Sequence, residues 1–124
     1  MISEVKRTPG GAILLDGIKL RDETVAKIKS TIVAAGSPKI CLATVLVGDD
    51  APSHIYVSNK HKKAQEAGMV SRGVNLPATA TQAQVEQAVA ELVADKSVHG
   101  ILVQLPLPKH IDAEAVLSLL PVEK

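Results

Sequence analysis

KICLATVLVG, residues 39–48, is the stretch that decides the fold of this chain. It is rich in β-branched residues and almost continuously apolar, which is typical of a strand that is covered on both faces. The stretch SHIYVSNKHKKAQEAG (53–68) comes shortly after it, and its pattern predicts a helix over 54–67 that stops at Gly68. A covered strand that leads into a helix is the first half of a parallel β-α-β unit.

The alternation of strand and helix continues toward the C-terminus. Thr81 and Gln84 have the spacing of a capping box at the start of a helix. Asp112 is placed to cap a last helix, and Pro121 is placed to stop it. The elements predicted here are a weak short strand at 71–77, a helix at 82–95, a buried strand at 98–108 and a helix at 112–120.

The N-terminal part carries a weaker pattern. AILLDG (12–17) predicts a short strand, and the segment 18–36 predicts a helix that ends at Gly36. One stripe of this helix is expected to face the interior. Its members are Leu20, Thr24, Ile28, Ile32 and Ala35.

Strands that alternate with helices predict an α/β fold with a parallel sheet and right-handed crossovers. We therefore expect a three-layer sandwich, with a mostly parallel sheet and helices on both faces. In such sheets, ligands bind beyond the carboxyl ends of the strands. The positions just after residues 47, 77 and 104 are the first places to look for a site.

Composition excludes several classes of function. The chain has 124 residues, which fits one domain, and a formal net charge of +1, which does not indicate a nucleic-acid or membrane partner. Tyr56 is its only aromatic residue, so the stacking platforms that bind single-stranded nucleic acid are missing. The lone Cys41 lies in an apolar run and is expected to be a core thiol in a reducing compartment. No apolar run in the sequence is long enough to span a membrane, and MISEVKRTPGG lacks the apolar stretch of a signal peptide. We therefore expect a cytoplasmic protein.

Lys60 occupies an unusual place on the helix predicted over 54–67. At 100° per residue, Tyr56, Val57, Ala64 and Ala67 fall within an arc of about 100°, and Lys60 lies near its middle. The side chain could lay its stem on apolar surface and hold its ammonium in water. Alternatively, a partly dehydrated lysine at the mouth of a cleft favours the neutral amine, which is a usable general base.

Other polar residues are expected near the same edge of the sheet. Gln104 ends an apolar strand, so its amide needs partners, which could be backbone or water, or the Lys60 amine and a ligand. Ser53 could cap the helix, and its hydroxyl could also face the cleft beside Tyr56. Asp49 and Asp50 are most simply turn residues. The four histidines are scattered and do not have the spacing of a metal site.

VGDDAPSHIYVSNKHKKAQEAGM (47–69), followed by GILVQLPLPKHID (100–112), closely resembles the bifunctional methylenetetrahydrofolate dehydrogenase/methenyltetrahydrofolate cyclohydrolase family, known as FolD. LDGIKLRDETVAKI (15–28) is similar to the first helix of that family. The resemblance covers residues 12–124. It implies an enzyme that oxidises 5,10-methylenetetrahydrofolate to the methenyl form with NADP, and hydrolyses that form to 10-formyltetrahydrofolate.

The resemblance also assigns roles to individual residues. It implies that Lys60 is the acid/base of the cyclohydrolase step, that Gln104 tunes it, and that Tyr56 lines the cleft and stacks on or orients the folate. Ser53, together with Leu105 and Pro106 of the second motif, is expected to contact the substrate. The resemblance carries no metal site.

The chain also departs from the family pattern. After the equivalent of PVEK (121–124) the family continues with an Asp-Val-Asp-Gly stretch, and its NAD(P)-binding Rossmann domain and a returning C-terminal helix come later. We therefore expect residues 1–124 to be the catalytic domain, with NADP bound mainly by a domain that this chain lacks. The parent enzyme would be a homodimer, the isolated domain could be monomeric, and alone it is expected to be inefficient in catalysis.

Two other interpretations remain open at this point. The chain could be a non-catalytic ligand-binding or interaction domain of dehydrogenase-like architecture. A short-chain dehydrogenase would also use Tyr-x-x-x-Lys, but that fold needs a glycine-rich loop after its first strand, and the sequence has none.

Overall fold

The central strand β1 (Cys41–Val47) has a parallel partner on each side. β2 (Val70–Leu76) and β3 (Gly100–Val103) complete a three-stranded sheet in the order β2-β1-β3. The register places Thr44 opposite Gly73 in β2 and opposite Leu102 in β3. This computed structural model describes residues 5–124 and confirms the three strands that the sequence predicts at 39–48, 71–77 and 98–108.

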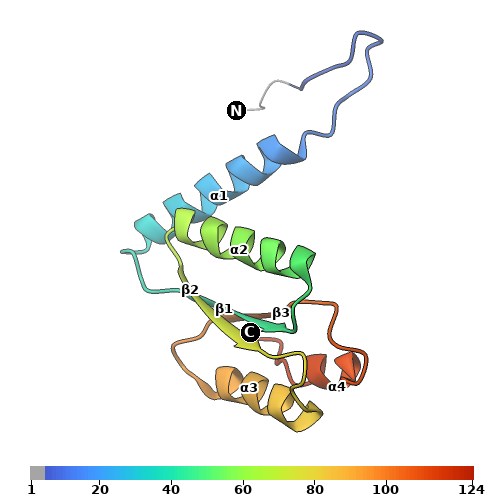
Figure 1. The fold of residues 1–124 in the computed structure, drawn as a ribbon. Helices are drawn as coiled ribbons and strands as arrows, with labels where there is room; N and C mark the ends of the chain where they lie inside the picture. The colour runs from blue at the N-terminus through green and yellow to red at the C-terminus, as the bar shows by residue number, and fades with distance from the viewer. Residues whose placement is uncertain (1–4) are drawn as a thin grey trace.

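Helices cover both faces of the sheet, as the three-layer prediction requires (Figure 1). α2 (Ala51–Glu66) packs on β1 and β2, and α1 (Gly17–Ala34) lies against α2 on that side. α3 (Gln82–Ala94) packs on β1 from the other face, and α4 (Ala113–Leu117) packs on α3. The predicted α/β sandwich is therefore confirmed.

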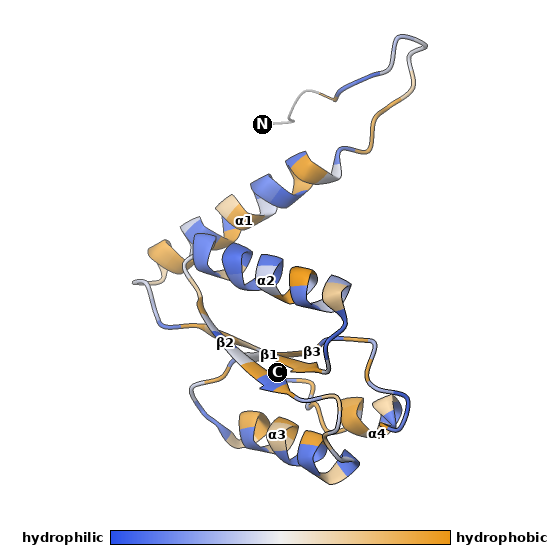
Figure 2. Ribbon diagram, in the orientation of Figure 1, coloured by the Kyte–Doolittle hydropathy of each residue, from blue (hydrophilic) through white to orange (hydrophobic). Residues whose placement is uncertain are grey.

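The hydrophobic core lies between the sheet and α3. Val45 of β1 and Val85 and Val89 of α3 are fully buried in it, and α4 adds Val116. In Figure 2 β1 and β3 are mostly orange, β2 is mixed in colour, and α2 is largely hydrophilic. Cys41 belongs to the same core, which confirms a buried structural thiol.

Several predicted bounds are wrong by a few residues, for local reasons. α2 begins at Ala51 because Asp50, and not Ser53, caps it. β3 ends at Val103, shortly before Pro106 and Pro108, which lack the N–H that a longer strand would need. α4 is capped by Asp112 as predicted, but it ends at Leu117.

The helix N-termini are all closed by side chains. Asp16, Asp50 and Asp112 accept hydrogen bonds from backbone N–H groups in the first turns of α1, α2 and α4. Thr81 and Gln84 form the predicted capping box of α3. These caps satisfy donors that would otherwise have no partner within the helix.

The N-terminal arm differs from the prediction. The segment 12–17 is not a strand. Ile13 makes only an isolated antiparallel bridge with Arg7, and this bridge is not part of the three-stranded sheet. Leu15 is 97% exposed. The arm projects from the rest of the fold (Figure 1), so no sheet edge is available to extend it into a strand.

The inward stripe predicted for α1 is also mostly wrong. Ile32 is buried, whereas the other four members, Leu20, Thr24, Ile28 and Ala35, are exposed. The main packing contact of α1 is with α2, and Ile32 is the only member of the stripe that it buries.

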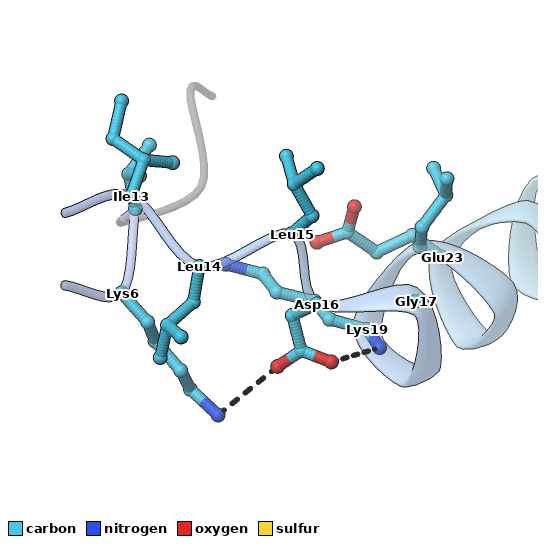
Figure 3. A pocket seen from close by; sticks show the side chains of 10 residues that line it. Lys6, Ile13, Leu14, Leu15, Asp16, Gly17, Lys19 and Glu23 are labelled. Carbon is cyan, nitrogen blue, oxygen red and sulfur yellow. Dashed lines mark hydrogen bonds and ion pairs between the residues drawn. The ribbon is translucent and has the colours of Figure 1, made fainter. Parts of the chain in front are cut away.

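A shallow hollow of about 330 Å³ lies between the arm and the first turns of α1, and all of its lining residues precede residue 24. Lys6 donates to Asp16 at 3.2 Å, and Asp16 also accepts from the backbone N–H of Lys19 at 3.0 Å (Figure 3). These bonds fix the arm to the start of α1. Among residues 5–124, no helix is both long enough and apolar enough to cross a membrane.

Candidate active site

The Lys60 amine and the Gln104 carboxamide meet at the carboxyl edge of the sheet. Lys60 Nζ donates to Gln104 Oε1 at 2.6 Å, although the two residues are 44 positions apart. Lys60 is half-buried, and Gln104 is only 9% exposed. This contact confirms the prediction that Gln104 reaches the Lys60 amine.

Gln104 is held in place by the backbone around it. Its N–H donates to the carbonyl of Val45 in β1 at 2.9 Å, and its Nε2 donates to the carbonyl of Leu105 at 2.8 Å. With Oε1 accepting from Lys60, both ends of the carboxamide have partners. A buried amide that is satisfied on both sides has a fixed orientation, so it presents its oxygen to the amine.

No carboxylate among the described residues forms an ion pair with Lys60, whereas Lys63 on the same helix pairs with Glu66 at 2.6 Å. The partner of Lys60 is a neutral oxygen. The Lys60 amine is therefore held by a neutral acceptor and by no carboxylate of the described residues.

Tyr56 lies one turn before Lys60, but its side chain is 58% exposed, so the prediction that it shares the buried arc is wrong. Val57, Ala64 and Ala67 of that arc are buried as expected. Tyr56 is in the second turn of α2, and among the described residues its hydroxyl has no hydrogen-bond partner. Its ring is open to a ligand at the rim of the site.

Ser53 is 2% exposed and is not the cap of α2, which corrects the prediction. Its hydroxyl donates to Asp50 Oδ2 at 2.5 Å, and its N–H donates to the same oxygen at 3.0 Å. These hydrogen bonds from Ser53, the hydroxyl first, lower the pKa of Asp50. Ser53 therefore supports the helix start, and its contact with a substrate stays a prediction.

Leu105 and Pro106 follow Gln104 on the same edge and are both exposed, with a cis peptide bond between them. They offer apolar surface beside the Lys60–Gln104 pair.

Three of the four histidines bond to backbone groups. His99 Nδ1 accepts from the backbone N–H of Cys41 at 3.0 Å, and His110 and His54 contact the backbone carbonyls of Ala80 and Gly48. In the described part of the chain, no cluster of three or more His, Cys, Asp or Glu side chains is arranged to hold a metal ion.

Two features of the site were not found from the sequence. Asp50 caps α2 and is not merely the turn residue that the sequence predicts, although an aspartate just before a helix is a recognisable cap. The hydrogen bond between His61 and Thr44, 2.7 Å long, joins α2 to β1 beside the site. The one sequence signal for this bond is Thr44 itself, a polar residue inside the otherwise apolar strand β1.

The family model described as "Tetrahydrofolate dehydrogenase/cyclohydrolase, catalytic domain" matches residues 15–124, which is most of the chain. The chain belongs to this family. Among curated relatives, the Bifunctional protein FolD of Listeria innocua is 44% identical over 113 residues, which cover 90% of this chain and 40% of the relative. The FolD of Moorella thermoacetica is 42% identical over 115 residues, with 91% and 41% covered. The chain thus spans about two fifths of the length of these relatives.

Solved structures of the family have the same fold. The bifunctional FolD enzyme of Campylobacter jejuni matches with a TM-score of 0.83 at 37% identity, over 89% of this chain and 40% of that one. The FolD of Trypanosoma brucei, solved in complex with NADP cofactor and inhibitor, matches with a TM-score of 0.84 at 31% identity, over 90% and 39%. Residues 15–124 are therefore a catalytic domain of the tetrahydrofolate dehydrogenase/cyclohydrolase family.

Proposed function

We propose that this chain is the folate-binding domain of an enzyme that oxidises 5,10-methylenetetrahydrofolate with NADP to the methenyl form and hydrolyses that form to 10-formyltetrahydrofolate. The hydrogen bond of 2.6 Å between Lys60 and Gln104, in a chain of this family, is the observation that carries the proposal. The full reaction is proposed for a protein of the relatives' length, because this chain spans about two fifths of it.

In the hydrolytic step, Lys60 acts as the general base and then as the general acid. Methenyltetrahydrofolate is a cation, and a cation beside the amine disfavours the ammonium form. The neutral amine takes a proton from water as the water oxygen bonds to the methenyl carbon. When the bond between that carbon and N5 breaks, the ammonium returns this proton to N5, and the remaining hydroxyl proton leaves to solvent as the formyl carbonyl forms.

The other residues position the reacting groups. Gln104 Oε1 holds the Lys60 Nζ atom in place, since the carboxamide is itself fixed by Leu105 and Val45. The exposed ring of Tyr56 stacks on or orients the pterin, and Leu105 and Pro106 contact the apolar part of the substrate. Ser53 acts indirectly, through the Asp50 cap that fixes the start of α2.

The described residues do not fit the pyrophosphate of NADP. A dinucleotide site needs a glycine-rich turn that opens onto a free helix N-terminus. Here the N-termini of α1, α2 and α4 are capped by aspartates, and that of α3 is closed by Thr81 and Gln84. We therefore assign no step of hydride transfer to these residues, and we propose that NADP is bound mainly outside them.

Substitution of Lys60 by Gln tests the proposal. The variant and its parent are fused to the nucleotide-binding part of the Campylobacter jejuni relative, and hydrolysis of methenyltetrahydrofolate is followed. We expect kcat to fall by about 10²–10⁴-fold, the usual contribution of a general acid–base group. Lys62→Gln is the matched control, because Lys62 is exposed on the same helix, and it is expected to keep the parental rate.

An unchanged rate in Lys60→Gln would reject the proposal, because hydrolysis would then not depend on the Lys60 amine. A fused parent without hydrolytic activity would leave a non-catalytic binding domain. Binding of 5-formyltetrahydrofolate to the 124-residue chain, measured by calorimetry, distinguishes these outcomes from a general loss of folding. We expect the Lys60→Gln chain to bind this ligand. We also propose that the longer protein is a cytoplasmic homodimer, as the family resemblance implies.

A further inference from the structure

Thr44 is a polar residue at the centre of the sheet, 1% exposed, on the face of β1 that meets α2. Ala43 and Val45, on either side of it, belong to the core on the opposite face. A buried hydroxyl without a partner costs about 1–3 kcal/mol. The hydroxyl of Thr44 finds its partner in His61, since the two side chains share a hydrogen bond of 2.7 Å between Oγ1 and Nε2.

The sheet leaves space for the His61 ring. Gly73 of β2 is the register partner of Thr44, and a Cβ atom at Gly73 would lie 3.3 Å from the Cε1 atom of His61. That distance is tighter than ordinary van der Waals contact, so the ring occupies space that a larger residue would take. Three elements, α2, β1 and β2, thus meet at one side chain.

His61 directly follows Lys60 on α2, and the bonds of both residues lead to neighbouring positions of β1. His61 bonds to Thr44, and Lys60 bonds to Gln104, whose backbone N–H donates to Val45. A rotation of α2 about its axis would move both side chains together. Gln65, one turn further on, bonds to the Ser71 hydroxyl at 3.2 Å in an exposed position, so the His61–Thr44 bond is the more buried of the two attachments to the strands.

We infer that His61 and Thr44 are a positioning pair, which fixes the rotation of α2 and thereby holds the Lys60 amine on the Gln104 carboxamide. The effect on catalysis rests on the proposed function, whereas the effect on the position of Lys60 rests only on the hydrogen bonds of His61 and Lys60. A displacement of about 1 Å at a catalytic group can cost about 100-fold in rate. The pair would therefore affect kcat without touching the substrate.

The test uses the 124-residue chain labelled with 15N and reads the side-chain amide resonances of Gln104 by NMR. His61→Leu and Thr44→Val each remove the bond with little change in volume, and both are expected to shift these resonances. The double variant is expected to shift them no further, because each substitution removes the same bond. His61→Gln, which keeps a nitrogen near the position of Nε2, is expected to restore the parental resonances.

His99→Leu is the matched control, because it also removes a bond between a histidine and β1, but at Cys41, the opposite end of the strand. It is expected to lower stability and leave the Gln104 resonances in place. Gln104 resonances that stay unchanged in folded Thr44→Val would overturn the inference, as would a shift of equal size in His99→Leu. Should His61→Leu fail to fold, Thr44→Val and His61→Gln still decide the outcome.

An assay of the fused enzyme then connects the geometry to the reaction. His61→Leu is expected to lower kcat for hydrolysis by about 10–100-fold with little change in KM, and His61→Gln to recover most of it. If Lys60→Gln leaves hydrolysis intact, the proposed function fails, yet the NMR result still tests the positioning pair. The two failures are therefore distinguishable.

Discussion

Lys60 and Gln104 are 44 residues apart in the chain, and their side chains are joined by a hydrogen bond of 2.6 Å between Nζ and Oε1. One residue lies in the middle of a helix and the other directly follows a strand. The parallel sheet brings them together. β3 pairs with β1, and α2 follows the carboxyl end of β1 in the chain, so the end of β3 and the start of α2 lie at the same edge of the sheet. This relationship determines what the site can do, and most of the following predictions depend on it or on the helix that supports it.

Gln104→Ala is expected to lower the rate of hydrolysis by the fused enzyme. The carboxamide oxygen accepts from Lys60 Nζ at 2.6 Å and holds the amine in place. Loss of this orientation should reduce the maximal rate by the equivalent of about 1.5–3 kcal/mol. A parental maximal rate in Gln104→Ala would contradict this role for Gln104.

Asp50→Ala is expected to lower the melting temperature of the 124-residue chain. Asp50 caps α2 through the Ser53 N–H and also accepts from the Ser53 hydroxyl. Its removal leaves both donors of a buried serine without this partner. Asp49→Ala is the control, since the neighbouring carboxylate caps nothing, and it should leave the melting curve in place. Equal melting temperatures for the two variants, measured by circular dichroism, would count against the cap.

Asp95 is expected to make stability depend on pH in acid. Hydrogen bonds from the Ser97 hydroxyl and N–H, and then from Arg72, lower the pKa of Asp95 from 3.8 to about 2. A pKa that is lower in the folded state stabilises the fold above the unfolded value and loses that effect as the pH falls. Stability should therefore decline between about pH 4 and pH 2.

Urea unfolding at a series of pH values checks this prediction. Asp95→Asn should be less stable than the parent above pH 4 and should show a flatter decline below it, because the titrating group is gone. Asp49→Asn serves as the control and should keep the parental slope. A parental slope in Asp95→Asn would show that other carboxylates cause the acid sensitivity.

Lys124→Met is expected to destabilise the fold through the end of α3. Lys124 Nζ donates to the carbonyls of Val93 at 2.8 Å and Asp95 at 2.7 Å. A cation at this end of a helix also interacts favourably with the helix dipole, with a typical contribution of about 0.3–1 kcal/mol. Lys109→Met, at an exposed lysine, should have no measurable effect on urea unfolding. Similar losses in both variants would contradict a specific role for Lys124.

The sequence by itself indicated the three strands of the sheet and their order along the chain. The apolar run at 39–48 is typical of a covered strand, and the capping residues Thr81 and Asp112 marked helix starts that the structure confirms. Local sequence could do this because strand burial and helix capping depend on residues only a few positions apart. The motifs around Lys60 and Gln104 also indicated the family, which the comparison confirms.

Tertiary structure alone decided which of those residues meet. In the folded chain Tyr56 is exposed at the rim of the site, Ser53 bonds to Asp50, and most of the α1 stripe is uncovered. The sequence could not predict these outcomes, because a helical wheel shows which face of a helix is apolar but not what lies against that face. It also paired His61 with Thr44, 17 positions earlier in the chain. Contacts between elements depend on the register and spacing of the whole sheet, and no short stretch of sequence contains that information.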